Sequence, residues 1–193
     1  EKKITVSYIS GIDGTTSFAK GSRYYVHLLG NGIQRFDHVK FVVQGRPCTD
    51  AATFESVMGE GNTFLLPETI DYGTYSMCYQ FVSFPDDYLS YPEITITIVE
   101  PLITSVEPHL AAVGIPVTLH LTGNAVSSHD SIKVVPSNEN CNTYNALTYN
   151  VNDNGDVVDA IFTEVIFIGK LCYRFGHWGN FHDFNIVFNV WNV

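Results

Sequence analysis

The sequence repeats itself at a nearly constant spacing, and this repeat limits what the chain can fold into. Residues 25–31 (YVHLLGN) and residues 118–124 (TLHLTGN) share histidine, leucine, glycine and asparagine at matching positions. The offset of 93 positions continues without a gap as far as Cys48 and Cys141. A repeat of this length indicates two modules of the same fold, each large enough for its own core. The predicted domains are residues 1–100 and 101–193.

Each module carries a second cysteine in a Cys-Tyr-x-Phe pattern, at Cys78 and at Cys172, about thirty residues after the first. In a strand, alternate side chains point to opposite faces, so the aromatic residues face the core and the cysteine shares the polar face. We predict disulfides Cys48–Cys78 and Cys141–Cys172, each on the outer surface of one sheet rather than across the core. Free thiols with a regulatory redox role are the alternative.

Short runs with a period of two, and no segment with a helical period, predict an all-β chain. We expect two tandem immunoglobulin-like β-sandwiches of about seven strands each, both with one intradomain disulfide. The first strand is expected at residues 3–8, and a turn-rich loop at residues 11–21. Residues 144–151 and 157–161 flank Asn154-Gly155, a dipeptide typical of a tight β-hairpin turn.

Charge and cysteine content exclude several function classes. The chain has 10 Lys+Arg and 20 Asp+Glu residues, hence a net charge of −10, which disfavours nucleic acids and anionic membranes as partners. No apolar run approaches the roughly 18 residues of a membrane span, so we expect no membrane insertion. Paired cysteines indicate an oxidising compartment, and we predict a secreted protein, extracellular or at the cell surface. No Asn-x-Ser/Thr acceptor is present, which leaves O-linkage for any glycan.

Nearly all of the second module resembles a known family, and through the internal repeat the resemblance extends to most of the first. Residues 101–108 (PLITSVEP) and 114–123 (GIPVTLHLTG) are similar to the opening strands of IPT/TIG domains, which begin with Ile-x-x-Val-x-Pro and continue with Gly-x-x-Val-x-Leu-x-x-x-Gly. The resemblance implies an immunoglobulin-like fold of the E-set type. The portion from Cys141 to Phe175 is similar to cysteine-bearing modules in surface proteins of microbes, especially protists. The first module departs from the pattern, because it lacks the proline after its first strand.

No catalytic constellation stands out, so we predict no enzyme activity and no cofactor. His177, Trp178 and His182 lie in one aromatic, glycine-bearing loop and are the candidate ligand-binding residues, although surface histidines are the simpler interpretation. Residues 150–156 begin like a calcium-binding loop, but the closing glutamate is missing and a plain turn fits better. We therefore predict no metal site.

Outward-facing apolar residues near both ends of the sequence suggest a partner surface, since a stripe of such residues on a terminal strand marks an interface. The candidate interface residues are Ile4, Val6, Tyr8, Val187, Trp191 and Val193. We favour an extracellular structural protein, the repeating subunit of a surface assembly or of a head-to-tail helical filament. The alternative is a ligand-binding, carbohydrate-binding or adhesion module of a larger cell-surface protein. The expected partner is accordingly a second copy of the chain or another extracellular protein.

Overall fold

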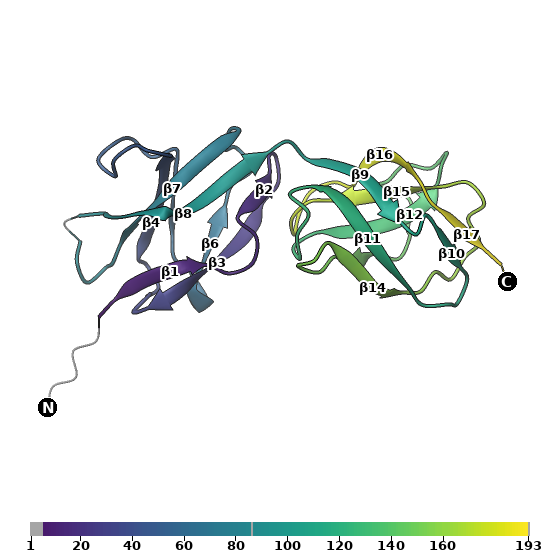
Figure 1. The fold of residues 1–193 in the computed structure, drawn as a ribbon, viewed down its shortest axis with the longest axis horizontal. Coiled ribbons are helices and arrows are strands. Elements are labelled where there is room, and N and C mark those ends of the chain that lie inside the picture. The colour runs from purple at the N-terminus through teal and green to yellow at the C-terminus, as the bar shows by residue number, and fades with distance from the viewer. Residues whose placement is uncertain (1–5, 86, 193) are drawn as a thin grey trace, which may run out of the picture. The chain divides into compact units, whose positions relative to one another are not determined.

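The computed structural model describes residues 6–85 and 87–192 of the 193-residue chain. The chain divides into two compact units, of which the first ends at Val99 and the second begins at Glu100 (Figure 1). Each unit is an immunoglobulin-like β-sandwich, so the predicted all-β fold class is confirmed. Within the described ranges, no helical segment has the length and hydrophobicity of a membrane span.

The first unit consists of two facing sheets. Its strands are β1 (Tyr8–Ile12), β2 (Ser17–Ala19), β3 (Tyr24–Asn31), β4 (His38–Val43), β5 (Phe54–Val57), β6 (Thr63–Leu66), β7 (Gly73–Gln80) and β8 (Leu89–Val99), with a short 3₁₀ helix η1 (Glu60–Asn62) before β6. One sheet has the order β1-β3-β6 and the other β2-β8-β7-β4-β5. Alternate side chains of β3 and β8 fill the space between the sheets, because a period of two puts every second residue on the inner face.

The second unit repeats this topology. Its strands are β9 (Leu102–Glu107), β10 (Leu110–Ala112), β11 (Val117–Asn124), β12 (Ser131–Pro136), β13 (Tyr149–Asn150), β14 (Asp156–Ala160), β15 (Gly169–Arg174), β16 (His182–Val187) and β17 (Asn189–Trp191). They form the sheets β14-β11-β9 and β13-β12-β15-β16 and the parallel pair β10-β17. His27 lies opposite Thr63, and His120 lies opposite Asp156, so the repeated histidines occupy equivalent positions in the two units.

The start of the first unit differs from the prediction. The strand expected at residues 3–8 begins only at Tyr8 and runs to Ile12; Val6 and Ser7 precede it, and residues 3–5 lie outside the described residues. The loop expected at residues 11–21 contains β2, which pairs in parallel with β8. The chain thus leaves one sheet after β1 and joins the other at β2, turning at Gly14 with a φ of 76° that favours glycine.

The predicted hairpin at Asn154-Gly155 is also wrong. The turn exists, with Gly155 at a φ of 80°, and the Asn152 side-chain oxygen accepts hydrogen bonds from the backbone N–H groups of Asn154 and Asp156, both at 2.9 Å. The flanking strands do not pair with each other, however, because β13 joins β12 and β14 joins β11. The turn therefore carries the chain from one sheet to the other.

A buried carboxylate organises the second unit. Asp130 is almost fully buried, and its oxygens accept hydrogen bonds from the Tyr173 hydroxyl at 2.7 Å, the Ser127 N–H at 2.8 Å and the Gly176 N–H at 2.7 Å. Burial raises the pKa of Asp130 to about 6, although these donors favour the charged form. The three bonds tie the start of β12 and the end of β15 to the loop that precedes β12.

The first unit contains the same arrangement. Asp37 is buried and accepts hydrogen bonds from the Tyr79 hydroxyl at 2.7 Å, the Gln34 N–H at 2.8 Å and the Val82 N–H at 2.6 Å. The aspartate and the tyrosine that recur in the two sequence repeats therefore form the same buried hydrogen bond in each unit. It explains why a charged residue recurs inside an otherwise apolar pattern.

The glycine of the repeated HLxGN segment allows two strands to approach closely. A Cβ atom at Gly30 would lie 2.3 Å from the Tyr8 carbonyl oxygen, and one at Gly123 would lie 2.1 Å from that of Leu102. We expect Gly30→Ala to lower the free energy of unfolding by at least about 2 kcal/mol, because the backbone of β1 must shift. Gly11→Ala is the control, since a Cβ there has nothing within 4 Å. Equal urea midpoints for the two variants, measured by circular dichroism, would contradict this.

Candidate binding sites

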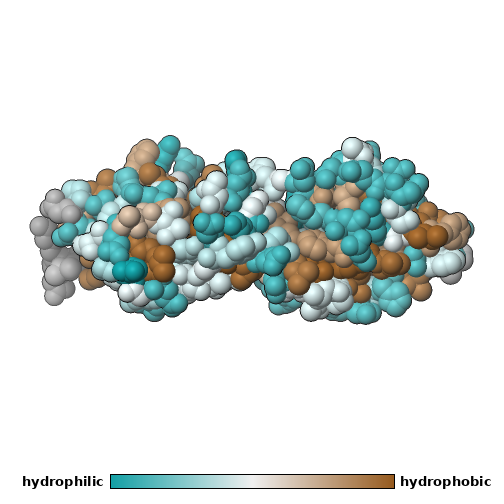
Figure 2. Space-filling model, turned by 90° about the horizontal axis from the view of Figure 1, so that it is seen from above, coloured by the Kyte–Doolittle hydropathy of each residue, from teal (hydrophilic) through white to brown (hydrophobic). Residues whose placement is uncertain are grey.

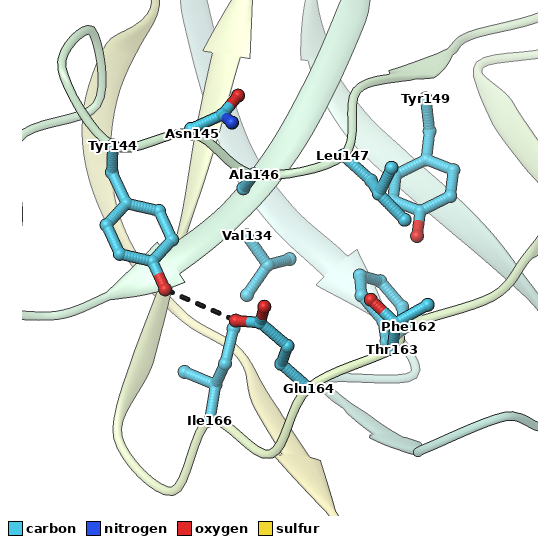
Figure 3. A pocket seen from close by; sticks show the side chains of 10 residues that line it. All are labelled: Val134, Tyr144, Asn145, Ala146, Leu147, Tyr149, Phe162, Thr163, Glu164 and Ile166. Carbon is cyan, nitrogen blue, oxygen red and sulfur yellow. Dashed lines mark hydrogen bonds between the residues drawn. The ribbon is translucent and has the colours of Figure 1, made fainter.

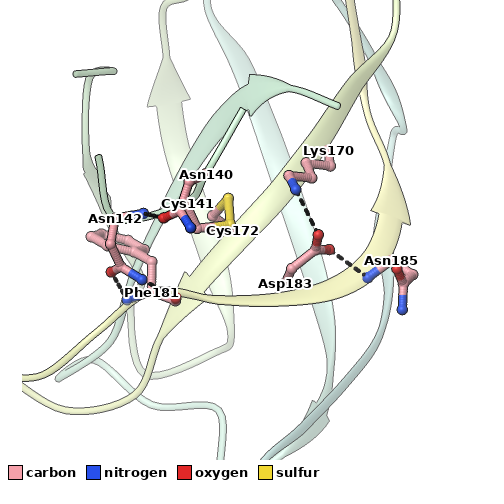
Figure 4. A network of polar contacts seen from close by, with 8 residues as sticks. All are labelled: Asn140, Cys141, Asn142, Lys170, Cys172, Phe181, Asp183 and Asn185. Carbon is pink, nitrogen blue, oxygen red and sulfur yellow. Dashed lines mark hydrogen bonds and ion pairs between the residues drawn. A yellow bond between two sulfur atoms is a disulfide. The ribbon is translucent and has the colours of Figure 1, made fainter. Parts of the chain in front are cut away.

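Both predicted disulfides are present and lie on the outer face of a sheet. Cys172 of β15 lies opposite Lys133 of β12, whereas its neighbour Tyr173 faces the core. Its disulfide partner is Cys141, and Cys48 pairs with Cys78 in the same way. The second disulfide is nevertheless shielded from solvent, because Tyr144, Ala146 and Phe181 pack over it. Together with Val135, these residues form a small second core outside the sandwich. Figure 4 shows the disulfide beside Phe181.

Polar contacts hold the cover of this second core in place. The Lys133 ammonium donates to the Tyr144 carbonyl oxygen at 2.9 Å and lies 4.7 Å from the centroid of the Phe181 ring. Burial and the nearby Arg174 guanidinium lower the pKa of Lys133. Asn142 exchanges two hydrogen bonds with the backbone of Phe181, at 2.7 and 3.0 Å (Figure 4). This face is thus occupied by the chain's own residues, and we assign it a structural role.

Of the predicted ligand residues, the structure keeps His177 and Trp178 in contact and places His182 on β16. The His177 ring lies 4.8 Å from that of His129 and 5.6 Å from that of Trp178, whereas His182 is on β16 opposite Tyr173. Burial lowers the pKa of His177, as does the Arg174 guanidinium. Among the described residues, no three histidine, cysteine or acidic side chains are grouped to hold a metal ion. His129, which the sequence did not single out, also lies beside His177.

Exposed apolar residues gather at the end of the second unit where β10 pairs with β17. This surface, termed the apolar end, consists of Leu110, Ile115, Phe167, Ile168 and Trp191. The Phe167 and Trp191 rings meet edge to face at 5.4 Å, and a groove of about 350 Å³ runs past Leu110, Ile115 and Trp191. Figure 2 shows hydrophobic residues at the right-hand end of this unit. The first unit has Ser17 and Ser22 at the positions of Leu110 and Ile115.

The predicted interface residues are exposed where the structure describes them. Val187 and Trp191 in the second unit and Val6 and Tyr8 in the first all lie at the surface. Ile4 and Val193 lie outside the described residues. Sequence reasoning missed Phe167 and Ile168, because they belong to a connection without a strand period.

The first unit has an apolar groove of its own, near the start of β8. It has a volume of about 430 Å³ and is lined by Phe81, Phe84, Asp87 and Leu89. Phe84 is the most exposed phenylalanine there, at 68%. Because β8 runs from Leu89 to Val99, the groove lies at the end of the unit opposite Val99.

A further pocket opens in the second unit beside β12. It has a volume of about 240 Å³ and is lined by Val134, Tyr144, Asn145, Ala146, Leu147, Tyr149, Phe162, Thr163, Glu164 and Ile166 (Figure 3). The hydroxyl of Tyr144 donates to the carboxylate of Glu164 at 3.4 Å, and both residues line the pocket. Desolvation and this carboxylate raise the pKa of Tyr144. The sequence analysis did not predict this second-unit pocket.

Comparison with known proteins identifies the fold but not a family. No protein-family model and no curated protein sequence matches this chain. The extracellular region of plexin A4 (domains 1 to 8) superposes with a TM-score of 0.56 at 11% identity, covering 98% of this chain and 18% of the plexin chain. A teleost fish polymeric Ig receptor ectodomain has a TM-score of 0.36 at 12% identity, covering 96% of this chain and 99% of the receptor chain. Domains 3–5 of Drosophila OTK have a TM-score of 0.31 at 11% identity, covering 97% of this chain and 63% of that one.

The plexin similarity extends over almost the whole of this chain, whereas the chain spans less than a fifth of the plexin chain. An identity of 11% carries information on fold alone. The structural superposition, the order of the strands and the two disulfides together establish that both units are immunoglobulin-like β-sandwiches.

Proposed function

We propose that this chain is an adhesion module of an extracellular protein and that it contacts other proteins through the apolar end of its second unit. The observation that carries the proposal is the cluster around Phe167 and Trp191, which are 63% and 45% exposed. Clustered exposed aromatic residues are typical of protein interfaces, where burying them is favourable. The two disulfides support an oxidising, extracellular setting.

A second copy of the chain is the partner that we propose first. The groove beside Phe84 and Leu89 offers an apolar surface to receive the apolar end of another copy. A contact between two different surfaces is heterologous, so it propagates from copy to copy unless the rotation closes a ring. This form of adhesion would make the chain the repeating subunit of a surface assembly or head-to-tail filament.

The proposal also covers the domain family of the two units and the type of glycan that the chain could carry. The IPT/TIG-like segments form the adjacent strands β9 and β11, whose close approach at Gly123 suits the glycine of that pattern. This geometry supports our proposal that the units are E-set domains of the IPT/TIG type. The resemblance of residues 141–175 to cysteine-bearing modules supports the further proposal of a microbial surface protein. Any glycan on this chain would be O-linked, because no N-linked acceptor sequence is present.

Sedimentation velocity over a concentration series tests the self-association. We expect the wild-type chain to associate. Trp191→Asp and Phe84→Asp should each remain monomeric on their own, because the contact needs both surfaces and each variant places a charge in one of them. An equimolar mixture of the two variants should form a one-to-one dimer, since each supplies the intact surface that the other lacks. Val158→Asp is the control, because Val158 is exposed on β14 outside both surfaces.

The outcomes separate three kinds of contact. Loss of association by Trp191→Asp with no effect of Phe84→Asp would mean that the apolar ends of two copies pair symmetrically. A wild-type chain that stays monomeric at every concentration would show that self-association is wrong and that the partner of the apolar end is a different protein. Equal effects of Val158→Asp and Trp191→Asp would contradict a contact through the apolar end.

A further inference from the structure

The second-unit pocket exists because the two units fill one place in their sandwich differently. In the first unit a cluster of aromatic rings fills it, with centroids 5.1 to 6.2 Å apart. The rings belong to Phe41, Phe54 and Phe64. The residues at the matching repeat positions of the second unit are Val134, Leu147 and Val157. Val134 and Leu147 line the pocket, and the aromatic rings beside them are those of Tyr149 and Phe162, 5.2 Å apart.

The pocket opens where Leu147 does not take the buried place that Phe54 occupies in the first unit. Phe54 is 8% exposed, whereas Leu147 at the matching position is 54% exposed. Apolar side chains left open to water lose the free energy of burial, so a sandwich normally covers them. The first unit shows that this fold can close the space with phenylalanine. A pocket kept open here points to an occupant.

The lining of the pocket selects a positively charged group. Val134, Phe162 and Ile166 give it an apolar floor, and Glu164 is its charged residue (Figure 3). No basic residue lines the pocket, and no ion pair to Glu164 occurs among the described residues. A carboxylate beside aromatic rings suits an ammonium or guanidinium group on an aliphatic stem, through charge-assisted hydrogen bonding and cation–π attraction.

The same lining disfavours a neutral sugar. The Tyr144 hydroxyl already donates to Glu164, and the Tyr149 hydroxyl already donates to the Ile161 carbonyl oxygen. Asn145 and Thr163 are the other neutral polar side chains of the lining. The charge of Glu164 is complemented by a basic side chain but not by a neutral sugar, and the apolar floor suits the stem of that side chain. The net charge of −10 further favours a cationic ligand over the anionic alternative.

We propose that the second-unit pocket binds the basic side chain, lysine or arginine, of a partner protein. The stem lies on the apolar floor and the cationic head meets Glu164. The pocket is separate from the apolar end, although Ile166 and Phe167 are consecutive in the chain. The inference rests on the pocket alone and extends the proposed function, because it specifies the chemistry of a partner.

Nuclear magnetic resonance of the ¹⁵N-labelled full chain tests the proposal with Nα-acetyl-L-lysine N-methylamide as the probe. We expect saturable shifts at the amides of Ala146, Leu147 and Thr163, and none in the first unit. Nα-acetyl-L-norleucine N-methylamide has the same stem without the ammonium group and should bind at least about tenfold more weakly. Glu164→Gln should weaken the lysine probe by a similar factor, and Glu93→Gln, an exposed glutamate of the first unit, should not.

A second variant tests the shape of the pocket. Leu147→Phe restores the residue of the first unit and should abolish the shifts without lowering the midpoint of unfolding, because Leu147 is exposed. Equal binding of the norleucine and lysine probes would overturn the proposal. So would saturation by methyl α-D-glucopyranoside at the same amides, or no saturable shift with either the lysine probe or its arginine counterpart. None of these results depends on the apolar end, so a failure here leaves the adhesion proposal standing.

Discussion

Replacing Asp130 with alanine should lower the free energy of unfolding of the second unit by about 3 to 5 kcal/mol. The carboxylate accepts hydrogen bonds from the Tyr173 hydroxyl and from the N–H groups of Ser127 and Gly176. Alanine leaves all three donors without their acceptor, in a place that water does not reach. Both tryptophans of the chain, Trp178 and Trp191, are in the second unit, so the midpoint of urea unfolding followed by tryptophan fluorescence reports on it directly.

Two further variants distinguish the contribution of the Asp130 carboxylate to stability from that of a single hydrogen-bond donor. Tyr173→Phe should cost about 1 to 2 kcal/mol, because it removes one hydrogen bond and leaves the other two. Asp153→Ala, at an exposed loop position of the same unit, should stay within about 0.5 kcal/mol of the wild type. If Asp130→Ala unfolded at the same urea concentration as Asp153→Ala, the carboxylate would not organise this unit.

The parts of the fold that were predictable follow from local patterns. Alternating apolar residues located β3, β6 and β11, since a strand with one buried face must repeat every second residue. The repeat then transferred each assignment to the other unit. The cysteine pairs followed from the same two facts, because Cys78 and Cys172 share the polar face of their strands and each has one equivalent partner.

The errors arose where distant packing decides the structure. Asn154-Gly155 specifies a tight turn but not which sheet the following strand joins, and β14 joins β11 on the opposite sheet. The strand β2 has three residues, too few to show a period, and forms because β8 offers it a free edge. Local sequence carries no information on either choice.

The candidate sites also contain features that the sequence predicts and features that only the structure shows. The exposure of Trp191 was predictable from strand alternation, whereas that of Phe167 depends on the path of an irregular connection. The two modules differ in sequence at the second-unit pocket, where the first has Phe54 and the second has Leu147 at the matching repeat position. The structure shows the consequence, because Phe54 is buried in β5 whereas Leu147 precedes β13 and is exposed.

Removing the Cys141–Cys172 disulfide by replacing both cysteines with alanine should lower the free energy of unfolding of the second unit by about 3 to 4 kcal/mol. The bridge spans a sequence separation of 31 residues, and without it the unfolded chain gains conformational freedom. The folded state also loses contacts, because Cys141 and Cys172 pack with Val135 beneath Tyr144 and Phe181. Tryptophan fluorescence during urea unfolding measures the change.

The matched control is the Cys48→Ala/Cys78→Ala variant, whose bridge closes a loop of similar length, with a separation of 30 residues, in the first unit. It should shift the tryptophan-reported midpoint less, because both tryptophans lie in the other unit. Hydrogen exchange should quicken at residues 141–146 in the Cys141→Ala/Cys172→Ala variant, since the bridge anchors that segment to β15. Unchanged exchange there would show that the hydrogen bond from Lys133 to the Tyr144 carbonyl oxygen suffices to hold the segment, and that the disulfide acts through the unfolded state alone.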